Sequence, residues 1–486
     1  MVSITVPGKG CFQLSLPLEA TVEDAETQLC QNLEGPWHGN RLMSKGARHL
    51  KATETLQQIA EFLPGTPCVL TNFSLLRPAG DVVRIERTED RGISVPQLLL
   101  LLDFVRDHVG HWCETSNMSE TFSVGQQLTF SGFNLYHACS WVIQPSTRGF
   151  NDGNGCSFVE LLASEATKQK PSWFVSHAWK EPVWSFVNVL QRHKTVRQLN
   201  TYYWVCAYAN NQHCVGEEIP ENPRKSSFYL ALKSCDGIIL VLDTNASAFG
   251  RIWCCFEESI AIEEQQMSDQ TPLLLDVGAT AFGQTHLITD GLAGQEIDMV
   301  PVLAWHSKTQ REASFPTEIL RHGLFVNICN ASATRQEDKS RILGSIALPR
   351  QDTALLSFVE SERYQEVNQG LASHFALASW YGHLVQRQPG QPLRDVAAAL
   401  AADGFRRIVQ LSFAGLRHFS DQQLEDLMTH LPRGVQVFHL DVSFTELQSL
   451  QALRHLKNLA LQSFEFRCVA SPLCRAESLA LLAGQT

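Results

Sequence analysis

The chain has 486 residues, a length typical of three or four domains that can each bury a core. Hydrophobic residues make up 44% and charged residues 18%, which excludes a wholly disordered protein. The net charge of −11 and the lack of a basic tail argue against a nucleic-acid surface, so we expect no nucleic-acid partner.

Fourteen cysteines occur without any Cys-x-x-Cys pair. This usage predicts reduced thiols and a cytoplasmic, or alternatively nuclear, protein. The longest apolar run, at 98–105, is shorter than the ~18 residues of a membrane helix, and Asp103 interrupts it. The amino terminus begins in strand-like alternation rather than with an apolar signal core. We therefore expect a protein without a membrane span.

The segment 1–75 is predicted to form a small α+β unit that begins with a hairpin. Hydrophobic residues alternate on both sides of the turn "PGKG", as in two antiparallel strands. The motif "TVED" has the form of a helix capping box. The elements expected next are a helix with Val22, Ala25, Leu29 and Leu33 on one face, a strand and turn at "NRLMSKGARHL", a helical turn at "ETLQQI" and a closing strand at "CVLTN".

In the order and spacing of these elements, the segment resembles a ubiquitin-like domain, which has the β-grasp fold. No Gly-Gly follows "CVLTN", so the resemblance implies a docking module for a protein partner rather than conjugation through a freed terminus. The alternative is a stable cap without a partner. The next segment, 76–164, is predicted to be a connector that contains a helix from Val95 to Val109 and the aromatic stretch "FNLYHACSWVI".

From residue 165 to residue 335, short apolar strands alternate with helices. This pattern predicts a parallel sheet covered on both faces, in a flavodoxin-like three-layer arrangement. Ligands of such sheets bind beyond the carboxyl ends of the strands. The expected strands are 173–176, "TYYWVCAYA", "GIILVLD" and "MVPVLAW", and the expected helices are "VWSFVNVLQRH", "SSFYLALKSC" and "RIWCCFEESIAIEEQQM".

Three motifs of this segment resemble a TIR domain, as found in plant immune receptors and in NAD⁺-cleaving enzymes. "FVSHAW" matches the first motif of the family, "CVGEEIP" the second, and "ILVLDTNASAFGRIWCCFEE" the strand, turn and Trp-Cys-x-x-Glu helix start. Two stretches depart from the family's pattern. Asn210 to Gln212 stand where the family usually carries an acid, and Arg251 replaces a serine.

The motif "GRIWCCFEES" places Glu257 on the apolar side of a helix, because Trp253, Glu257 and either Ile260 or Ala261 share a face. A buried carboxyl is costly unless it is paired or serves a ligand. The resemblance implies that Glu257 lies against the nicotinamide ribose of NAD⁺, which would be a substrate, with no cofactor required. The residues expected to hold the dinucleotide are Ser176, His177, Trp179, Asn210, Asn211, Gln212 and Trp253.

Other interpretations of this motif stay open. In many TIR domains the same glutamate is retained while the domain only assembles with itself or with other proteins. A cysteine nucleophile at Cys254 or Cys255 would need a histidine such as His177 beside it. Adjacent helical residues point about 100° apart, so the cysteine pair is not expected to hold a metal, and core packing is the default for both.

The carboxyl-terminal third is predicted to hold a helical region at 336–404 and a strand-rich tail at 405–486. Three similar strands are expected at 408–413, 438–444 and 459–464, and their central leucines, 411, 440 and 461, are 29 and 21 residues apart. This period resembles short leucine-rich repeats, which implies a partner-binding face. An irregular helical cap on the preceding domain is the alternative.

Together these features predict a multidomain signalling or scaffold protein with ubiquitin-like, TIR-like and repeat-like parts. Its expected activity is hydrolysis of NAD⁺ to nicotinamide and ADP-ribose. The competing hypothesis is an adaptor that binds proteins without catalysis, and a third is a cysteine-dependent hydrolase.

Overall fold

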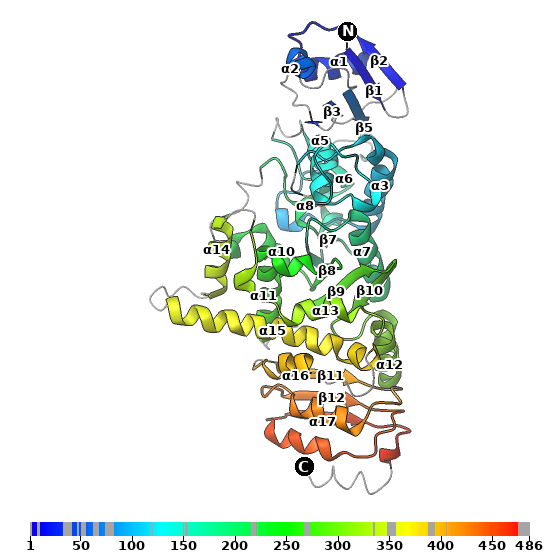
Figure 1. Cartoon of the computed structure of the whole chain (residues 1–486), viewed down its shortest axis with the longest axis vertical. Coiled ribbons are helices and arrows are strands. Elements are labelled where there is room, and N and C mark those ends of the chain that lie inside the picture. Colours follow the sequence, from blue (N-terminus) through cyan, green and yellow to red (C-terminus); the bar gives the residue numbers. More distant parts are fainter. Residues whose placement is uncertain are drawn as a thin grey trace.

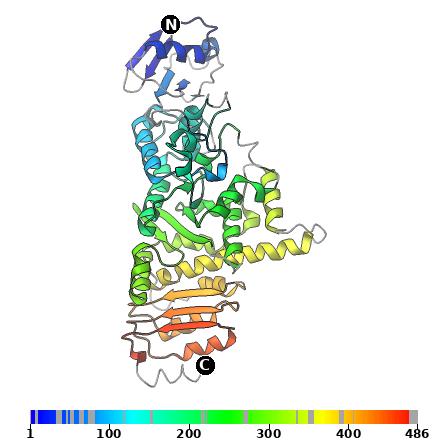
Figure 2. The same ribbon diagram turned by 180° about the vertical axis from the view of Figure 1, so that it is seen from behind.

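A computed structural model describes most of the chain, arranged as three units along its length (Figure 1). The described residues are 2–6, 10–32, 41–45, 48–49, 55–61, 68–72, 82–116, 118, 120–148, 150, 154–214, 220, 222–266, 273–333, 336–347, 356–386, 394–404 and 406–474. A small sheet forms one end, a parallel-rich sheet covered by helices the centre, and a third sheet the other end (Figures 1 and 2). The chain is therefore a mixed α/β protein with a parallel-rich central sheet. The expected leucine Leu33, the "PGKG" turn and most of "CVGEEIP" lie outside the described residues.

The amino-terminal sheet has the strand order β2-β1-β5-β3-β4. Its central strands β1 and β5 run parallel, and the remaining pairs are antiparallel. The strands are β1 Val2–Val6, β2 Gly10–Leu14, β3 Arg41–Lys45, β4 Arg48–His49 and β5 Cys68–Asn72. Two helices accompany them, α1 Val22–Asn32 and α2 Leu56–Glu61.

Helix α1 begins as the sequence predicts. The backbone N–H of Thr21 donates to the Asp24 carboxylate, and the N–H of Asp24 donates to the Thr21 hydroxyl. Val22, Ala25 and Leu29 are then buried on one face of the helix.

The central sheet has the strand order β10-β9-β8-β6-β7. Read from the β7 edge and numbered along the chain, this order is 2-1-3-4-5. Strands β6, β7, β8 and β9 are parallel, and β10 pairs antiparallel with β9. The strands are β6 Trp173–His177, β7 Tyr203–Trp204, β8 Gly237–Leu242, β9 Leu274–Ala281 and β10 Gln284–Ile288.

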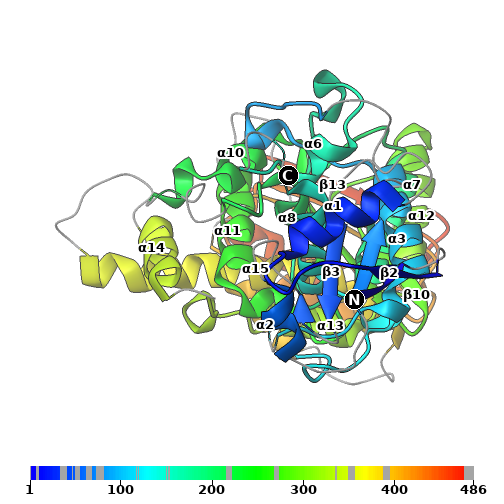
Figure 3. The ribbon, with the colours of Figure 1, turned by 90° about the horizontal axis from the view of Figure 1, so that it is seen from above.

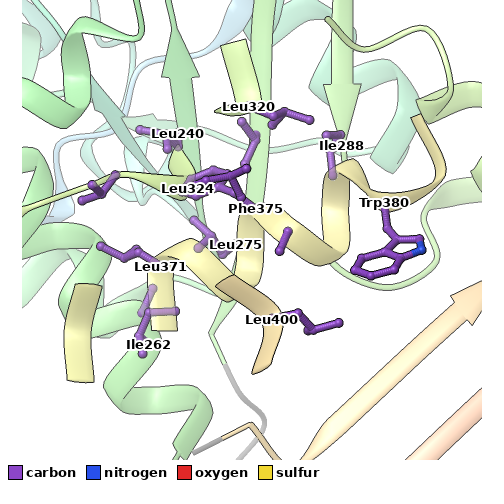
Figure 4. Close-up of a cluster of buried hydrophobic side chains, with 14 of the residues drawn as sticks. Leu240, Ile262, Leu275, Ile288, Leu320, Leu324, Leu371, Phe375, Trp380 and Leu400 are labelled. Atoms are coloured by element: carbon purple, nitrogen blue, oxygen red, sulfur yellow. The ribbon is translucent and has the colours of Figure 1, made fainter. Parts of the chain in front are cut away.

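Helices cover both faces of this sheet, as the continuous apolar strands predict. Helix α7 Val183–Arg197 lies on one face, and α10 Ser227–Ser234 and α11 Ile252–Gln266 lie on the other (Figure 3). Successive strand residues enter different cores, so Phe174 packs toward α11 and Val175 toward α7. Figure 4 shows part of the core on the α11 face, where Leu240 and Leu275 of the sheet meet Leu371 and Phe375 of helix α15 Leu356–Gln386.

The described part of the segment 76–164 packs onto the α7 face of the central sheet. Its helices are α3 Val95–His108, α4 Leu135–Ala138, α5 Gln144–Thr147 and α6 Phe158–Leu162, with a π-helical turn at Cys139–Ile143. Ile93 forms two backbone hydrogen bonds with Tyr203 of the edge strand β7, both of 2.8 Å. Buried residues of this segment belong to the same core as Val175 and Phe186, so the segment packs against the central sheet.

Two expected strands of the central unit are corrected by the structure. The stretch "MVPVLAW" is not a strand: Pro301 starts the helix α12 Pro301–Glu312, a position where its missing N–H is harmless. The fourth strand is β9 instead. The expected strand "TYYWVCAYA" shrinks to β7, because its second half forms the short helix α8 Cys206–Ala209.

Helices connect the central sheet to the third sheet. They are α12, α13 Thr317–Leu324, α14 Gln336–Ala347, α15 and α16 Arg394–Ala401. The long helix α15 crosses the molecule between the two sheets (Figure 1).

The third sheet consists of three parallel strands, β11 Ile408–Ser412, β12 Val437–Asp441 and β13 Ser463–Arg467. Helix α17 Asp421–Thr429 links the first two strands and a 3₁₀ helix, Gln451–Asn458, links the last two. The register aligns Leu411 with Leu440 and then with Phe466, so the expected third central residue, Leu461, lies before its strand. The expected strand 459–464 is thus shifted toward the carboxyl terminus.

A similar backbone turn follows each of these three strands. Gly415, Phe444 and Ala470 have φ angles of 80°, 59° and 52°, and each stands four residues after an aligned central residue. The N–H of Gly415 donates to the carbonyl of Ser443, and the N–H of Phe444 to that of Val469. The same left-handed turn therefore follows each of the strands β11, β12 and β13.

Candidate functional site

The predicted site residues surround the carboxyl ends of β6 and β8. These two parallel strands are adjacent, and the chain adds later strands on opposite sides of them. In open sheets of this kind, ligands bind at such a switch point. Ser176 lies near the end of β6, and the loop after β8 leads into the start of α11. This loop is tightly folded, because the Asp243 carboxylate accepts hydrogen bonds from the N–H groups of Asn245 and Ser247.

Glu257 is buried on α11, as the helical spacing predicts, with 5% of its surface exposed. Among the described residues, its Oε2 atom has no hydrogen-bond partner. Burial raises the pKa of the Glu257 carboxyl to about 8, although the Ser176 hydroxyl and the Arg251 guanidinium act in the opposite direction. The carboxyl is therefore mostly protonated at neutral pH, and Ser176 and Arg251 are its close polar neighbours.

Ser176 is a close neighbour of both Glu257 and Cys254. Its side chain is fully buried, and its Oγ atom has no hydrogen-bond partner within the described chain. It lowers the pKa of both neighbouring groups. The Ser176 hydroxyl and one oxygen of the nearby Glu257 carboxyl make no hydrogen bond of normal geometry among the described residues, which is unusual because buried polar groups are nearly always hydrogen-bonded.

Arg251 reaches this cluster from the residue before α11. Its Nη1 group donates to the Tyr136 hydroxyl over 3.1 Å. Backbone bonds fix its position, because Ser332 accepts from the N–H of Ile252 and donates to the carbonyl of Gly250. The arginine that departs from the TIR pattern is thus held beside Glu257.

The two cysteines of the motif are packed in the core. Cys254 Sγ donates to the carbonyl of His177 at 3.4 Å, and Cys255 Sγ to that of Phe249 at 3.5 Å. Burial raises the pKa of both thiols well above the ordinary value, so neither is a thiolate. These observations favour the packing interpretation over a nucleophile.

His177 and the two tryptophans take different positions. His177 follows Ser176 in the strand and packs on Phe186 of α7, with ring centroids 5.0 Å apart, on the face of the sheet opposite Glu257. Burial lowers its pKa to about 4, so it is neutral. Trp179 donates to Cys206 Sγ at 3.4 Å, and Trp253 stacks on Phe228 at 4.8 Å.

The three polar residues after α8 hold their own loop together. Asn210 Nδ2 donates to the carbonyl of Cys206 and its Oδ1 accepts from Ser227 Oγ. Asn211 Nδ2 donates to a backbone carbonyl of the segment before α6, and Gln212 Nε2 donates to the carbonyl of Ala207. None of the recorded bonds of these amides reaches Glu257 within the described chain.

Two further acids at this edge were missed from the sequence. Glu258 is fully buried, and both of its carboxyl oxygens lack partners among the described residues. Burial, with Glu257 adding to it, raises the Glu258 pKa well above the ordinary value. Glu181 accepts from Ser185 Oγ at 2.8 Å, and burial raises its pKa to about 8. The sequence did contain a signal for Glu258, because two adjacent glutamates, Glu257 and Glu258, stand in an otherwise apolar helix.

A cavity of about 430 Å³ lies elsewhere, where α12 and α15 meet the strand β11. Its wall does not include Glu257 or any other predicted site residue. The conformation described here therefore separates the acid cluster from this cavity.

Comparisons with known proteins give no relative. No model of a protein family matches the chain, and no curated protein or solved structure matches it significantly. Among the helices that the structure describes, none is both long enough and apolar enough to cross a bilayer.

Proposed function

We propose that the chain is a modular signalling protein whose TIR-like unit, 165–335, cleaves NAD⁺ to nicotinamide and ADP-ribose, with Glu257 as the key carboxylate. The observation that carries this proposal is the pair of unsatisfied buried groups, Glu257 Oε2 and Ser176 Oγ, at the ligand-binding edge of the sheet. A ligand that accepts from Ser176 and interacts with the carboxyl would satisfy both.

The reaction needs few groups from the protein. The bond between the nicotinamide nitrogen and the ribose carbon breaks, and the electron pair leaves with nicotinamide, which becomes neutral. The ribose is left as an oxocarbenium ion that a nearby carboxylate stabilises, and water then adds to it with loss of a proton. Glu257 must be ionised for this role. A cationic nicotinamide next to it favours ionisation, since an opposite charge lowers the pKa of a carboxyl.

The proposal also requires a movement. With 5% of its surface exposed, Glu257 meets a ribose only after the β8–α11 loop opens. That loop contains Ala246 at φ 51°, a conformation that a non-glycine residue rarely adopts. We propose that self-association of TIR-like units opens the loop.

The decisive experiment measures nicotinamide release from NAD⁺ by the full chain over a range of protein concentrations. Glu257→Gln is expected to lower the rate more than 100-fold, whereas Glu318→Gln, the control at an exposed glutamate of the same unit, stays within threefold. Wild-type kcat/KM should rise with pH and level off above about 8, where the free-enzyme Glu257 is ionised. Absence of release at every concentration, or equal losses in the two variants, would overturn the proposal.

The second candidate is an adaptor without catalysis. The burial of Glu257, which leaves its carboxyl out of reach of a ligand in this conformation, favours it. The strand order β2-β1-β5-β3-β4 supports a ubiquitin-like β-grasp module at 1–75, and the repeated turns support a leucine-rich-repeat-like tail at 405–486. Both would bind protein partners. Apolar side chains exposed on the tail, including Ile408, Phe444 and Val469, suit such a face. Concentration-dependent assembly without nicotinamide release would favour this candidate.

A further inference from the structure

The cavity at the junction of the central unit and the third sheet has the features of a binding site for a small molecule. Its volume, about 430 Å³, is within the range of ligand pockets, which often form where two units meet. Residues from the ends of β9 and β10, from α12 and α15, and from β11 contribute to its wall. A ligand there would contact both units at once.

Most of the wall is apolar or aromatic. Ile262 and Ile288, which belong to the core shown in Figure 4, form part of it, and Leu411 contributes from β11. Trp305 of α12 and Tyr381 of α15 add two aromatic rings. These side chains favour a ligand with a flat apolar body.

The cationic side chain of Arg406 in the wall has hydrogen-bond donors that its bonds within the described chain do not use. The Arg406 side chain is 14% exposed, and its recorded bonds, to Ser373 Oγ and to the Asp403 carboxylate, both leave from Nε at 3.1 Å. Within the described chain, its two Nη groups make no hydrogen bond. Guanidinium Nη groups are suited to bind a carboxylate or a sulfonate in bidentate fashion.

The other buried charges of the wall are already satisfied. Lys308 Nζ donates to the carbonyl of Thr289 at 2.6 Å and to both Glu312 oxygens at 2.5 and 2.6 Å. The Asp290 carboxylate accepts from the N–H of Leu275 at 3.3 Å. Arg406 is therefore the group in this wall that is best placed to receive an anion.

We propose that this cavity binds a small organic acid that has a flat aromatic body and a single anionic group. The anion pairs with the Nη groups of Arg406, and the aromatic body lies on the apolar wall near Trp305 and Tyr381. Because the ligand touches β9, α15 and β11 together, its binding stabilises the junction between the two units. This proposal is independent of NAD⁺ cleavage at Glu257.

The probe for the test is 1-anilinonaphthalene-8-sulfonate, an aromatic monoanion whose fluorescence rises on transfer from water to an apolar site. We expect the full chain to bind one equivalent at micromolar concentration. The neutral analogue N-phenyl-1-naphthylamine, which has the same rings without the sulfonate, should bind at least 10-fold more weakly.

Two variants address the cavity and its anion site separately. Ala378→Trp, on the α15 part of the wall, fills the space and should weaken binding of the anionic probe at least 10-fold. Arg406→Gln should weaken the anionic probe to a similar degree and leave the neutral analogue within twofold. Arg417→Gln, an exposed arginine of the same unit outside the cavity, is the matched control and should change neither affinity.

Thermal unfolding of each variant without probe identifies any that does not fold, and Ala378→Trp carries the test if Arg406→Gln fails. Unchanged affinity in Ala378→Trp would overturn the site. Equal binding of the charged and neutral probes would overturn the assignment of an acid as ligand. Failure of the wild-type chain to bind either probe would overturn both.

Discussion

Two buried carboxyl groups lie at opposite ends of the central sheet, and their surroundings differ sharply. Asp276, near the start of β9, accepts hydrogen bonds from His193 Nε2 at 3.0 Å and from Arg197 Nε and Nη2 at 2.8 and 2.5 Å. It also accepts from the backbone N–H of Asp290 at 2.8 Å. Every oxygen of this carboxylate is thus engaged. Glu257, near the carboxyl ends of β6 and β8, has an oxygen without a partner in the described chain.

The two environments act on the pKa in opposite directions. Burial alone would raise the pKa of Asp276, but the hydrogen bonds from His193 and Arg197 outweigh it and lower the pKa. Burial lowers the pKa of His193 despite its bond to Asp276, so the neutral ring donates from Nε2 to Asp276 and accepts from the Tyr203 hydroxyl at Nδ1. For Glu257, burial prevails and the pKa rises to about 8. One end of the sheet is built for stability, and the other holds unsatisfied groups suited to a ligand.

The largest effect expected from this comparison is on stability at the Asp276 end. Asp276→Asn removes the charge that pairs with buried Arg197 and should lower the free energy of unfolding by about 3–5 kcal/mol. Urea denaturation at pH 7 measures it. Because the folded-state pKa of Asp276 is lowered, this stabilisation is present above the unfolded pKa of about 3.9 and is lost as pH falls below it, so the difference between variant and wild type should shrink there.

The control for this measurement is Asp298→Asn, which changes an exposed aspartate and should stay within about 0.5 kcal/mol of wild type. A loss below about 1 kcal/mol for Asp276→Asn would mean that the network does not support the sheet. Nicotinamide release by the part of Asp276→Asn that stays folded should be unchanged, because the network lies at the far end of the sheet from Glu257.

The sequence could predict the Glu257 end of the sheet far better than the Asp276 end. Apolar spacing on a helix was enough to bury Glu257, and strands β6 and β8 were predicted because they are continuously apolar. Strand β9 was missed because Asp276 and Gly278 interrupt its apolar run. Both interruptions have structural causes: Asp276 accepts hydrogen bonds from His193 and Arg197, and a Cβ atom at Gly278 would clash with the Val189 side chain of α7.

Contacts between distant segments were beyond sequence patterns. Nothing in the sequence pairs Asp276 with His193 and Arg197, and nothing signals that Ser176 and Glu257 lack partners. The cavity was equally hidden, because its wall combines α12, which was predicted as a strand, with residues of α15 and β11. Local periodicity determines which residues are buried, whereas partners depend on how the elements pack.

A pH-dependent effect is expected at the Glu257 end. Between about pH 4.5 and 8 the folded protein keeps the Glu257 proton, whereas the unfolded chain has lost it. The folded state therefore binds more protons in this window, and rising pH lowers its stability by up to about 1.4 kcal/mol per pH unit through this group. Glu257→Gln removes this dependence.

Urea denaturation at pH 5 and pH 7.5 checks the expectation. The stability of Glu257→Gln relative to wild type should increase between these two values, whereas Glu446→Gln, which changes an exposed glutamate, should show no such trend. Parallel stabilities for Glu257→Gln and wild type would show that Glu257 ionises normally, and the contrast with Asp276 would then disappear.

The smallest effect concerns a strained residue at the stable end. Gln198 follows α7 with φ 56° and ψ 43°, and its N–H caps the helix by donating to the carbonyls of Lys194 and Thr195. Glycine adopts this left-handed cap without a Cβ penalty, so Gln198→Gly should raise the free energy of unfolding by about 0.5–1 kcal/mol. Gln198→Ala shortens the side chain but keeps the Cβ atom, and should give no such gain. Since this end of the sheet serves stability, thermal unfolding should shift upward in the glycine variant while its rate of nicotinamide release stays that of wild type; a fall in that rate would show that the two ends of the sheet are coupled.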